Sequence, residues 1–195
     1  MAWSRLIHTD LGAAARAQYQ SDHRRHYHNW GHVMRLYYHA EHTLALPYDP
    51  DLDAAILVHD VIYDALPDKE LRSADWLCAQ DPELGARARP HVLRTIDHMP
   101  SDDNRIAMLD LLDMCDAEVN ALNFELVRLE SRALYGVSDA AFAQANRAFI
   151  GAMRERFSDE VLAPLSPGDR AVYEGIRGGL SQLISLAEAL EARAA

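Results

Sequence analysis

The segment "DLDAAILVHDVIYD", residues 51–64, limits the fold most strongly because it places a histidine and an aspartate in the most apolar stretch of the chain. Its almost continuous apolar character predicts a helix that is buried on most sides. Because an unpaired buried charge is costly, His59 and Asp60 need compensation from a mutual hydrogen bond, an arginine or a shared cation. Taken alone, such a dipeptide is more often a satisfied core histidine beside an aspartate that reaches a helix end, since dipeptides recur by accident.

Helix-period patterning dominates the rest of the chain, and no convincing alternating strand pairs occur. Asn29 is the expected N-cap of one of these helices. A chain of 195 residues suits one domain with a sizeable core. The sequence therefore predicts an all-α fold, a single-domain helical bundle over residues 1–195. We expect its remaining helices at about residues 3–20, 29–46, 69–79, 84–97, 103–117, 123–157 (interrupted at "YGVSD") and 167–195.

The charge balance limits the partners. The net charge is −11, and Lys69 is the only lysine among 19 basic residues, so long nucleic acids are disfavoured. A small anionic substrate is compatible with this charge, since a metal ion and a few arginines can reverse the local field. No apolar run approaches the length of a membrane span, and the first residues lack the pattern of a signal peptide. We therefore expect a cytoplasmic protein with no membrane partner.

Imidazole and carboxylate groups recur in other helical segments. His32 follows His28 by four residues in "RRHYHNWGHV", and Asp113 and Asp116 interrupt the apolar segment "LDLLDMCDAEV". Such ligands without cysteine suit one divalent transition metal, namely Mn, Fe, Co, Ni or Zn, and Mg is also compatible. A metal would explain how these groups tolerate apolar helices. It would also activate a water molecule as a nucleophile.

Five motifs follow one another over residues 24–116: "RHYHNWGHV", "HDVIYD", "ELRSA" at 70–74, "TIDH" at 95–98 and "LDMCD" at 112–116. Together, and in this order, these motifs resemble the HD superfamily of metal-dependent phosphohydrolases, and most closely its branch of small predicted HD phosphohydrolases. The resemblance implies a helical fold and metal-assisted hydrolysis, but no particular substrate. The C-terminal helices, at about 123–195, would complete this HD-type domain.

The resemblance also implies a set of metal ligands. His32 corresponds to the first ligand histidine of the branch, and His59 and Asp60 correspond to its central pair. The last motif of the branch has one residue between its two aspartates, whereas two residues separate Asp113 from Asp116 in this chain. We expect Asp116 to be the fourth ligand because the polar residues after it place it nearer a helix end. Asp113 is the alternative.

Other matched residues are candidates for catalysis and substrate binding. Alongside Asp60, Asp64 would orient a ligand or a water from one helical turn further along the same face. Glu70 would act as a general base, although the helix dipole explains a glutamate in a first turn equally well. His28 could instead cap or pack at its helix start. The substrate-binding candidates, with the cations and His98 expected to contact phosphate, are Arg24, Arg25, Tyr27, His28 and His98.

The expected function is hydrolysis of a small phosphorylated metabolite, with a nucleotide as the favoured substrate, by metal-activated water. One alternative is a di-iron oxygenase that cleaves a C–C or C–P bond, with His91 and His98 as extra ligands to two irons. A further alternative is a non-catalytic nucleotide-binding protein of the same fold. The apolar stripe of the last helix, "LSQLISLAEALEA", would pack on the domain or form a homo-oligomer with a second copy of the chain.

Overall fold

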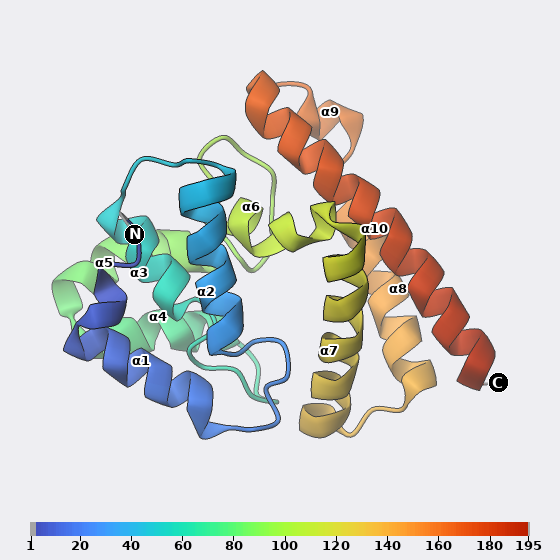
Figure 1. The fold of residues 1–195 in the computed structure, drawn as a ribbon, viewed down its shortest axis with the longest axis horizontal. Helices are drawn as coiled ribbons and strands as arrows, with labels where there is room; N and C mark the ends of the chain where they lie inside the picture. Colours follow the sequence, from blue (N-terminus) through green and yellow to red (C-terminus); the bar gives the residue numbers. More distant parts are fainter. Residues whose placement is uncertain (1–2, 195) are drawn as a thin grey trace. The chain divides into compact units, whose positions relative to one another are not determined.

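The computed structural model describes residues 3–194, and within that range it contains helices and no strands (Figure 1). This confirms the predicted all-α class. The chain forms two compact units. The N-terminal unit runs to Asp97 and includes Arg105–Asp110, and the C-terminal unit contains His98–Asn104 and the chain from Leu111 onward. That the two units act as one domain stays a prediction.

The N-terminal unit is built around a short apolar helix, α3. All residues of α3 from Leu52 to Val58 are buried, and the helix packs against α2 and α5. Helices α4 and α5 approach very closely at Gly85, where a Cβ atom would lie 2.6 Å from the Cα atom of Cys78. The elements of this unit are η1 (Leu6–His8), α1 (Asp10–Ser21), α2 (Trp30–Tyr38), the π-helical turn η2 (His39–Thr43), α3 (Pro50–Val58), α4 (Lys69–Gln80), α5 (Pro82–Leu93) and most of α6 (Arg105–Leu111).

Local caps determine where these helices begin. The side chain of Asn29 accepts hydrogen bonds from the backbone N–H groups of Gly31 at 2.8 Å and His32 at 3.4 Å, as its predicted N-cap role requires. Asp49 caps α3 in the same way, with Pro50 in the first turn. Thr9 caps α1, so this helix begins at Asp10 and not at Trp3 as predicted. The Asn29 cap fixes His32 in the first turn of α2.

Helix α3 ends earlier than the apolar pattern predicts. His59 is its C-cap, and Asp60 lies in the turn that follows. The two residues therefore lie at the end of the buried helix and not inside it. Asp64 also lies outside any helix, so the prediction that it shares a helical face with Asp60 is wrong.

The C-terminal unit consists of η3 (Leu112–Cys115), α7 (Ala117–Tyr135), α8 (Asp139–Arg156), α9 (Asp159–Leu162) and α10 (Pro167–Ala194). Helix α10 packs against η3, α7 and α8. The predicted interruption at "YGVSD" is present, because Gly136 ends α7 at a φ of 66° and Ser138 caps α8. Over the described part of the chain, no helix combines the length and the apolar character that a membrane span needs.

Candidate metal centre

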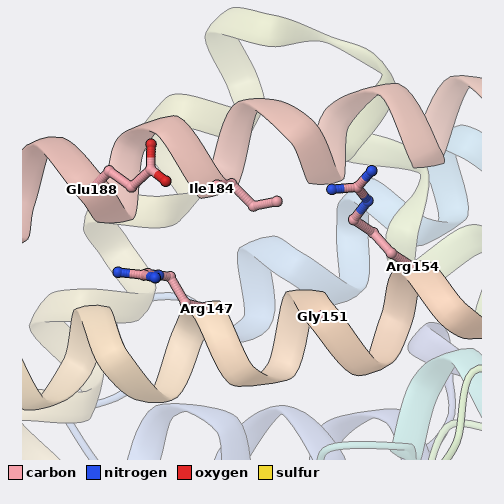
Figure 2. Close-up of a pocket in the computed structure, with 5 residues that line it drawn as sticks. All are labelled: Arg147, Gly151, Arg154, Ile184 and Glu188. Carbon is pink, nitrogen blue, oxygen red and sulfur yellow. The ribbon is translucent and has the colours of Figure 1, made fainter.

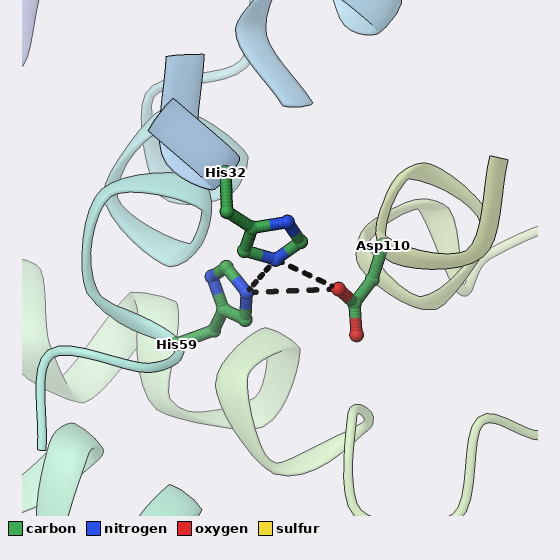
Figure 3. A group of neighbouring side chains, drawn as sticks. All are labelled: His32, His59 and Asp110. Carbon is green, nitrogen blue, oxygen red and sulfur yellow. Dashed lines mark hydrogen bonds and ion pairs between the residues drawn. The ribbon is translucent and has the colours of Figure 1, made fainter. Parts of the chain in front are cut away.

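Three side chains of the N-terminal unit meet at one point: His32 from α2, His59 from the end of α3 and Asp110 from α6 (Figure 3). The two Nε2 atoms lie 3.2 Å apart. Asp110 Oδ1 lies 3.0 Å from Nε2 of His32 and 3.8 Å from Nε2 of His59. Both histidines are at most 1% exposed. The cluster therefore places three potential ligand atoms around one small, buried volume.

Asp60 lies beside this cluster, close to its two histidines. Its Oδ2 atom lies 3.2 Å from Nε2 of His59 and 3.9 Å from Nε2 of His32. Around an octahedral ion with bonds of about 2.1 Å, neighbouring donors lie about 3.0 Å apart and opposite donors about 4.2 Å apart. The short separations in the cluster, 3.0 to 3.2 Å, match neighbouring donors, and the longer ones, 3.8 and 3.9 Å, approach opposite donors. The three donors of His32, His59 and Asp110, which all lie within 4.8 Å of one another, therefore suit a single divalent ion, and Asp60 stays a predicted further ligand.

The ring of His59 is oriented by its other nitrogen. Nδ1 lies 3.2 Å from the carbonyl oxygen of Ile56, and because a carbonyl can only accept, Nδ1 is the donor. This leaves Nε2 facing the cluster, which is the arrangement of a ligating histidine. Burial opposes protonation of His59, but the carboxylates of Asp60 and Asp110 outweigh burial and raise the pKa of His59 to about 9.

The ring of His32 is oriented by packing and not by such a hydrogen bond. Among residues 3–194, its Nδ1 atom has no hydrogen-bond partner, whereas the ring of Tyr27 lies at 4.9 Å between centroids. Complete burial lowers the pKa of His32, against the opposing effect of Asp110. For Asp60, burial alone would raise the pKa, but the charges of His59 and His28 hold it well below its usual range. At neutral pH, Asp60 is therefore a carboxylate and His32 a neutral imidazole, whereas His59 carries a proton that a bound cation would displace.

The carboxylate beside the two histidines is Asp110, whereas Asp116, with Asp113 as the alternative, was expected at this position. Asp116 is the N-cap of α7, where its Oδ1 atom accepts from the backbone N–H groups of Glu118 at 2.9 Å and Val119 at 3.1 Å. Asp113 accepts a hydrogen bond of 3.0 Å from the side-chain amide of Asn123. The polar residues that drew attention to Asp116 are the first turn of the helix that it caps.

The two arginines expected to bind phosphate have other partners. Arg24 pairs with Asp22, with Nη2 and Oδ2 2.6 Å apart. Arg25 is 5% exposed and donates to three backbone carbonyls, those of His28 at 2.6 Å, Asp60 at 2.5 Å and Val61 at 3.3 Å. Arg25 therefore holds the turn after α3 against the segment before α2. Its contribution is to the position of Asp60.

Tyr27 and His28 lie beside the cluster, and their role in substrate binding stays a prediction. Nε2 of His28 is 4.0 Å from Oδ2 of Asp60. The rings of Tyr27 and His28 are 4.7 Å apart between centroids. The ring of Tyr63 stacks on the ring of His28, with the two ring centroids 3.9 Å apart and the two ring planes inclined by 18°. Tyr63 was not singled out from the sequence, although its place in "HDVIYD" was the signal available.

The remaining candidates are distributed over other elements. Asp64 forms a bidentate ion pair with Arg72 of α4, with N–O distances of 2.6 and 2.9 Å. Its carboxylate therefore pairs with an arginine and not with a ligand of the metal cluster. Glu70 lies in the first turn of α4, with Oε1 3.9 Å from Nζ of Lys69. His98 lies in the C-terminal unit and has a φ of 52°. Their proposed catalytic and binding roles stay predictions.

A hollow of about 340 Å³ in the C-terminal unit lies between α8 and α10 (Figure 2). Arg147, Gly151 and Arg154 line it from α8, and Ile184 and Glu188 line it from α10. Arg147 is paired with Glu191 of α10 at 2.7 Å. Among the described residues, the side chains grouped closely enough to bind a metal are those of the N-terminal unit. The residues that line the hollow between α8 and α10 do not form such a group.

Comparisons of the chain with protein-family models, with curated proteins and with solved structures give no match.

Proposed function

We propose that the chain is a metal-dependent phosphohydrolase of the HD type that acts on a small phosphorylated metabolite, with a nucleotide as the expected substrate. The observation that carries the proposal is the set of three donor atoms, from His32, His59 and Asp110, that lie close enough together for one divalent ion, with Asp60 beside His59. The order of the motifs over residues 24–116, which resembles the HD superfamily, supports the same class.

The charges of the cluster also favour an anionic substrate once an ion is bound. Two carboxylates and a divalent ion sum to zero, so a phosphate group would not be repelled by the ligands. A bound ion would supply Lewis acidity toward a phosphoryl oxygen and lower the pKa of a coordinated water. The chain's own residues would hold the ion, exclude solvent from one side through burial of His32 and His59, and place His28 to donate a hydrogen bond to the substrate.

Metal content tests the first part of the proposal. Protein purified without chelator should contain about one divalent transition metal per chain. Asp110→Asn should weaken metal binding by more than about 100-fold, since even changes outside the ligands cost about 10- to 100-fold. Asp116→Asn is the matched control, because asparagine retains the N-cap and the metal should stay bound. The reverse result, metal lost in Asp116→Asn and kept in Asp110→Asn, would contradict the assignment.

Turnover tests the second part. Metal-loaded protein should release phosphate or pyrophosphate from at least one member of a panel of nucleoside mono-, di- and triphosphates, and Asp110→Asn should not. Two irons per chain together with substrate-dependent O₂ consumption would instead identify the di-iron oxygenase. Stoichiometric nucleotide binding without turnover by the metal-loaded protein would identify the non-catalytic alternative.

A further inference from the structure

His28 lies beside the metal centre but outside its group of ligand atoms. Its Nε2 atom is 4.0 Å from Oδ2 of Asp60, which exceeds a hydrogen bond. The side chain of His28 is 17% exposed, whereas those of His32 and His59 are at most 1% exposed. Of these three imidazoles, that of His28 is therefore the one that a ligand arriving from solvent can reach.

Two aromatic rings determine the orientation of the His28 ring. The ring of Tyr63 stacks flat on it, with the centroids 3.9 Å apart and the planes inclined by 18°. The ring of Tyr27 meets it edge-on, with the centroids 4.7 Å apart and the planes at 90°. Because an imidazole that is packed flat against another ring cannot turn about its Cβ–Cγ bond without losing that contact, Tyr63 holds the direction in which Nε2 of His28 points.

The backbone on both sides of this stack is also fixed. The buried Arg25 donates to the carbonyl oxygen of His28 at 2.6 Å and to the carbonyls of the turn after α3, so it joins the two segments that carry the stacked rings. Ser73 of α4 is 0% exposed, and its hydroxyl accepts a hydrogen bond of 3.0 Å from the N–H group of Ile62 and donates one of 3.3 Å to the carbonyl oxygen of the same residue. Ser73 therefore holds the residue that precedes Tyr63.

We propose that Tyr63 is a positioning residue, which holds His28 so that its imidazole contacts the anionic group bound at the metal centre. This inference rests on the proposed function, and it adds a residue that acts through His28 and not on the metal. Tyr63 and Ser73 belong to the motifs "HDVIYD" and "ELRSA". The stack and the Ser73 contacts give these two motifs a shared role apart from metal binding, which is to place the ring against which His28 packs.

Binding of inorganic phosphate to the metal-loaded protein tests the inference. Tyr63→Leu removes the flat ring, so the His28 ring gains rotational freedom and phosphate should bind about 10-fold more weakly, since small misplacements of a contacting group are costly. Tyr63→Phe keeps the stack and is the matched control, which should bind phosphate as the wild type does. Metal affinity should be unchanged in both variants because the ligand atoms are untouched. Loss of metal together with phosphate in Tyr63→Leu would show that Tyr63 only supports the turn after α3, and it would overturn the inference.

A double-mutant cycle with His28→Ala measures whether Tyr63 acts through His28. His28→Ala should weaken phosphate binding by about 10-fold or more, as expected for loss of a hydrogen bond to a charged group. In the His28→Ala background, Tyr63→Leu should cause no further loss, since no imidazole remains to be held. Additive losses, or a Tyr63→Leu variant that binds phosphate as tightly as the wild type, would overturn this inference and leave the proposed function in place. A protein that takes up no metal removes the proposed function, and the inference with it.

Ser73→Ala gives a second reading that leaves both stacked rings intact. Removal of the hydroxyl releases the backbone of Ile62, so phosphate binding should weaken by about threefold while His28 is present. In the His28→Ala background the same substitution should have no effect on phosphate binding. An equal loss in both backgrounds would overturn the inference, because it would show that α4 supports the metal centre by a route that does not include His28.

Discussion

Two buried aspartates of the N-terminal unit, Asp53 on α3 and Asp60 just after it, have their buried charge compensated by different kinds of group. Asp53 is 0% exposed and its carboxylate has a complete set of neutral donors from the protein. The hydroxyl of Tyr37 donates to it at 2.6 Å and that of Tyr48 at 3.1 Å. The backbone N–H groups of Arg5 and Leu6 add bonds of 3.2 and 3.4 Å. This carboxylate ties the start of the chain to α3.

Asp60 is 6% exposed, but its carboxylate faces imidazole nitrogens in place of hydroxyl and backbone donors. The nearest are Nε2 of His59 at 3.2 Å, His32 at 3.9 Å and His28 at 4.0 Å. Two of these three distances exceed a hydrogen bond. A buried carboxylate with four neutral donors stabilises a fold, whereas one that shares its space with several imidazole nitrogens suits a cation. Burial alone does not distinguish the two roles.

The largest expected effect comes from removing the satisfied carboxylate. Asp53→Ala leaves two tyrosine hydroxyls and two backbone N–H groups without an acceptor, so it should lower the free energy of unfolding by about 3 to 5 kcal/mol. Urea denaturation measures this loss. Tyr48→Phe, which removes one donor, should cost only about 1 kcal/mol. If Asp53→Ala costs less than Tyr48→Phe, the hydrogen-bond network does not carry the stability assigned to it.

Addition of metal should distinguish the roles of the two aspartates through a change of intermediate size in the free energy of unfolding. A ligand that binds only the folded state at 100 times its Kd raises the free energy of unfolding by about 2.7 kcal/mol. Wild-type protein and Tyr48→Phe should both gain this amount over chelator-treated protein, because the Asp53 network lies outside the ligand set. Asp60→Ala should gain almost nothing. Thermal unfolding with and without metal gives the comparison, and an equal gain in Asp60→Ala would remove Asp60 from the ligand set.

Much of this site could be predicted from the sequence because its signals are local. Asn29 precedes an apolar-periodic segment, which predicts a cap, and the cap places His32 at the start of α2. The ionisable pair His59 and Asp60 in an apolar segment indicates a need for compensation, whichever element carries it. The structure brings these two residues and His32 together.

Asp110 was missed because the helical period changes immediately after it. The α-helical geometry of α6 ends at Leu111, and a 3-10 helix, η3, follows from Leu112. A 3-10 helix has three residues per turn, so the direction of side chains after Leu111 does not follow from the apolar pattern before it. The roles of Arg25 and Asp64 depend on contacts with distant segments, namely the turn after α3 and Arg72 of α4. Such pairings have no periodic signal in the chain.

The smallest expected effect tests whether Asp116 is only a cap. Asp116→Ala removes the side-chain acceptor for the N–H groups of Glu118 and Val119, which should cost about 1 kcal/mol of unfolding free energy. Because this aspartate contributes to the start of α7 and not to the cluster, metal content should equal that of the wild type. Urea denaturation and metal analysis of the same preparation provide both numbers. Loss of metal in this variant would return the fourth ligand to Asp116 and leave Asp110 as a hydrogen-bond partner of His32.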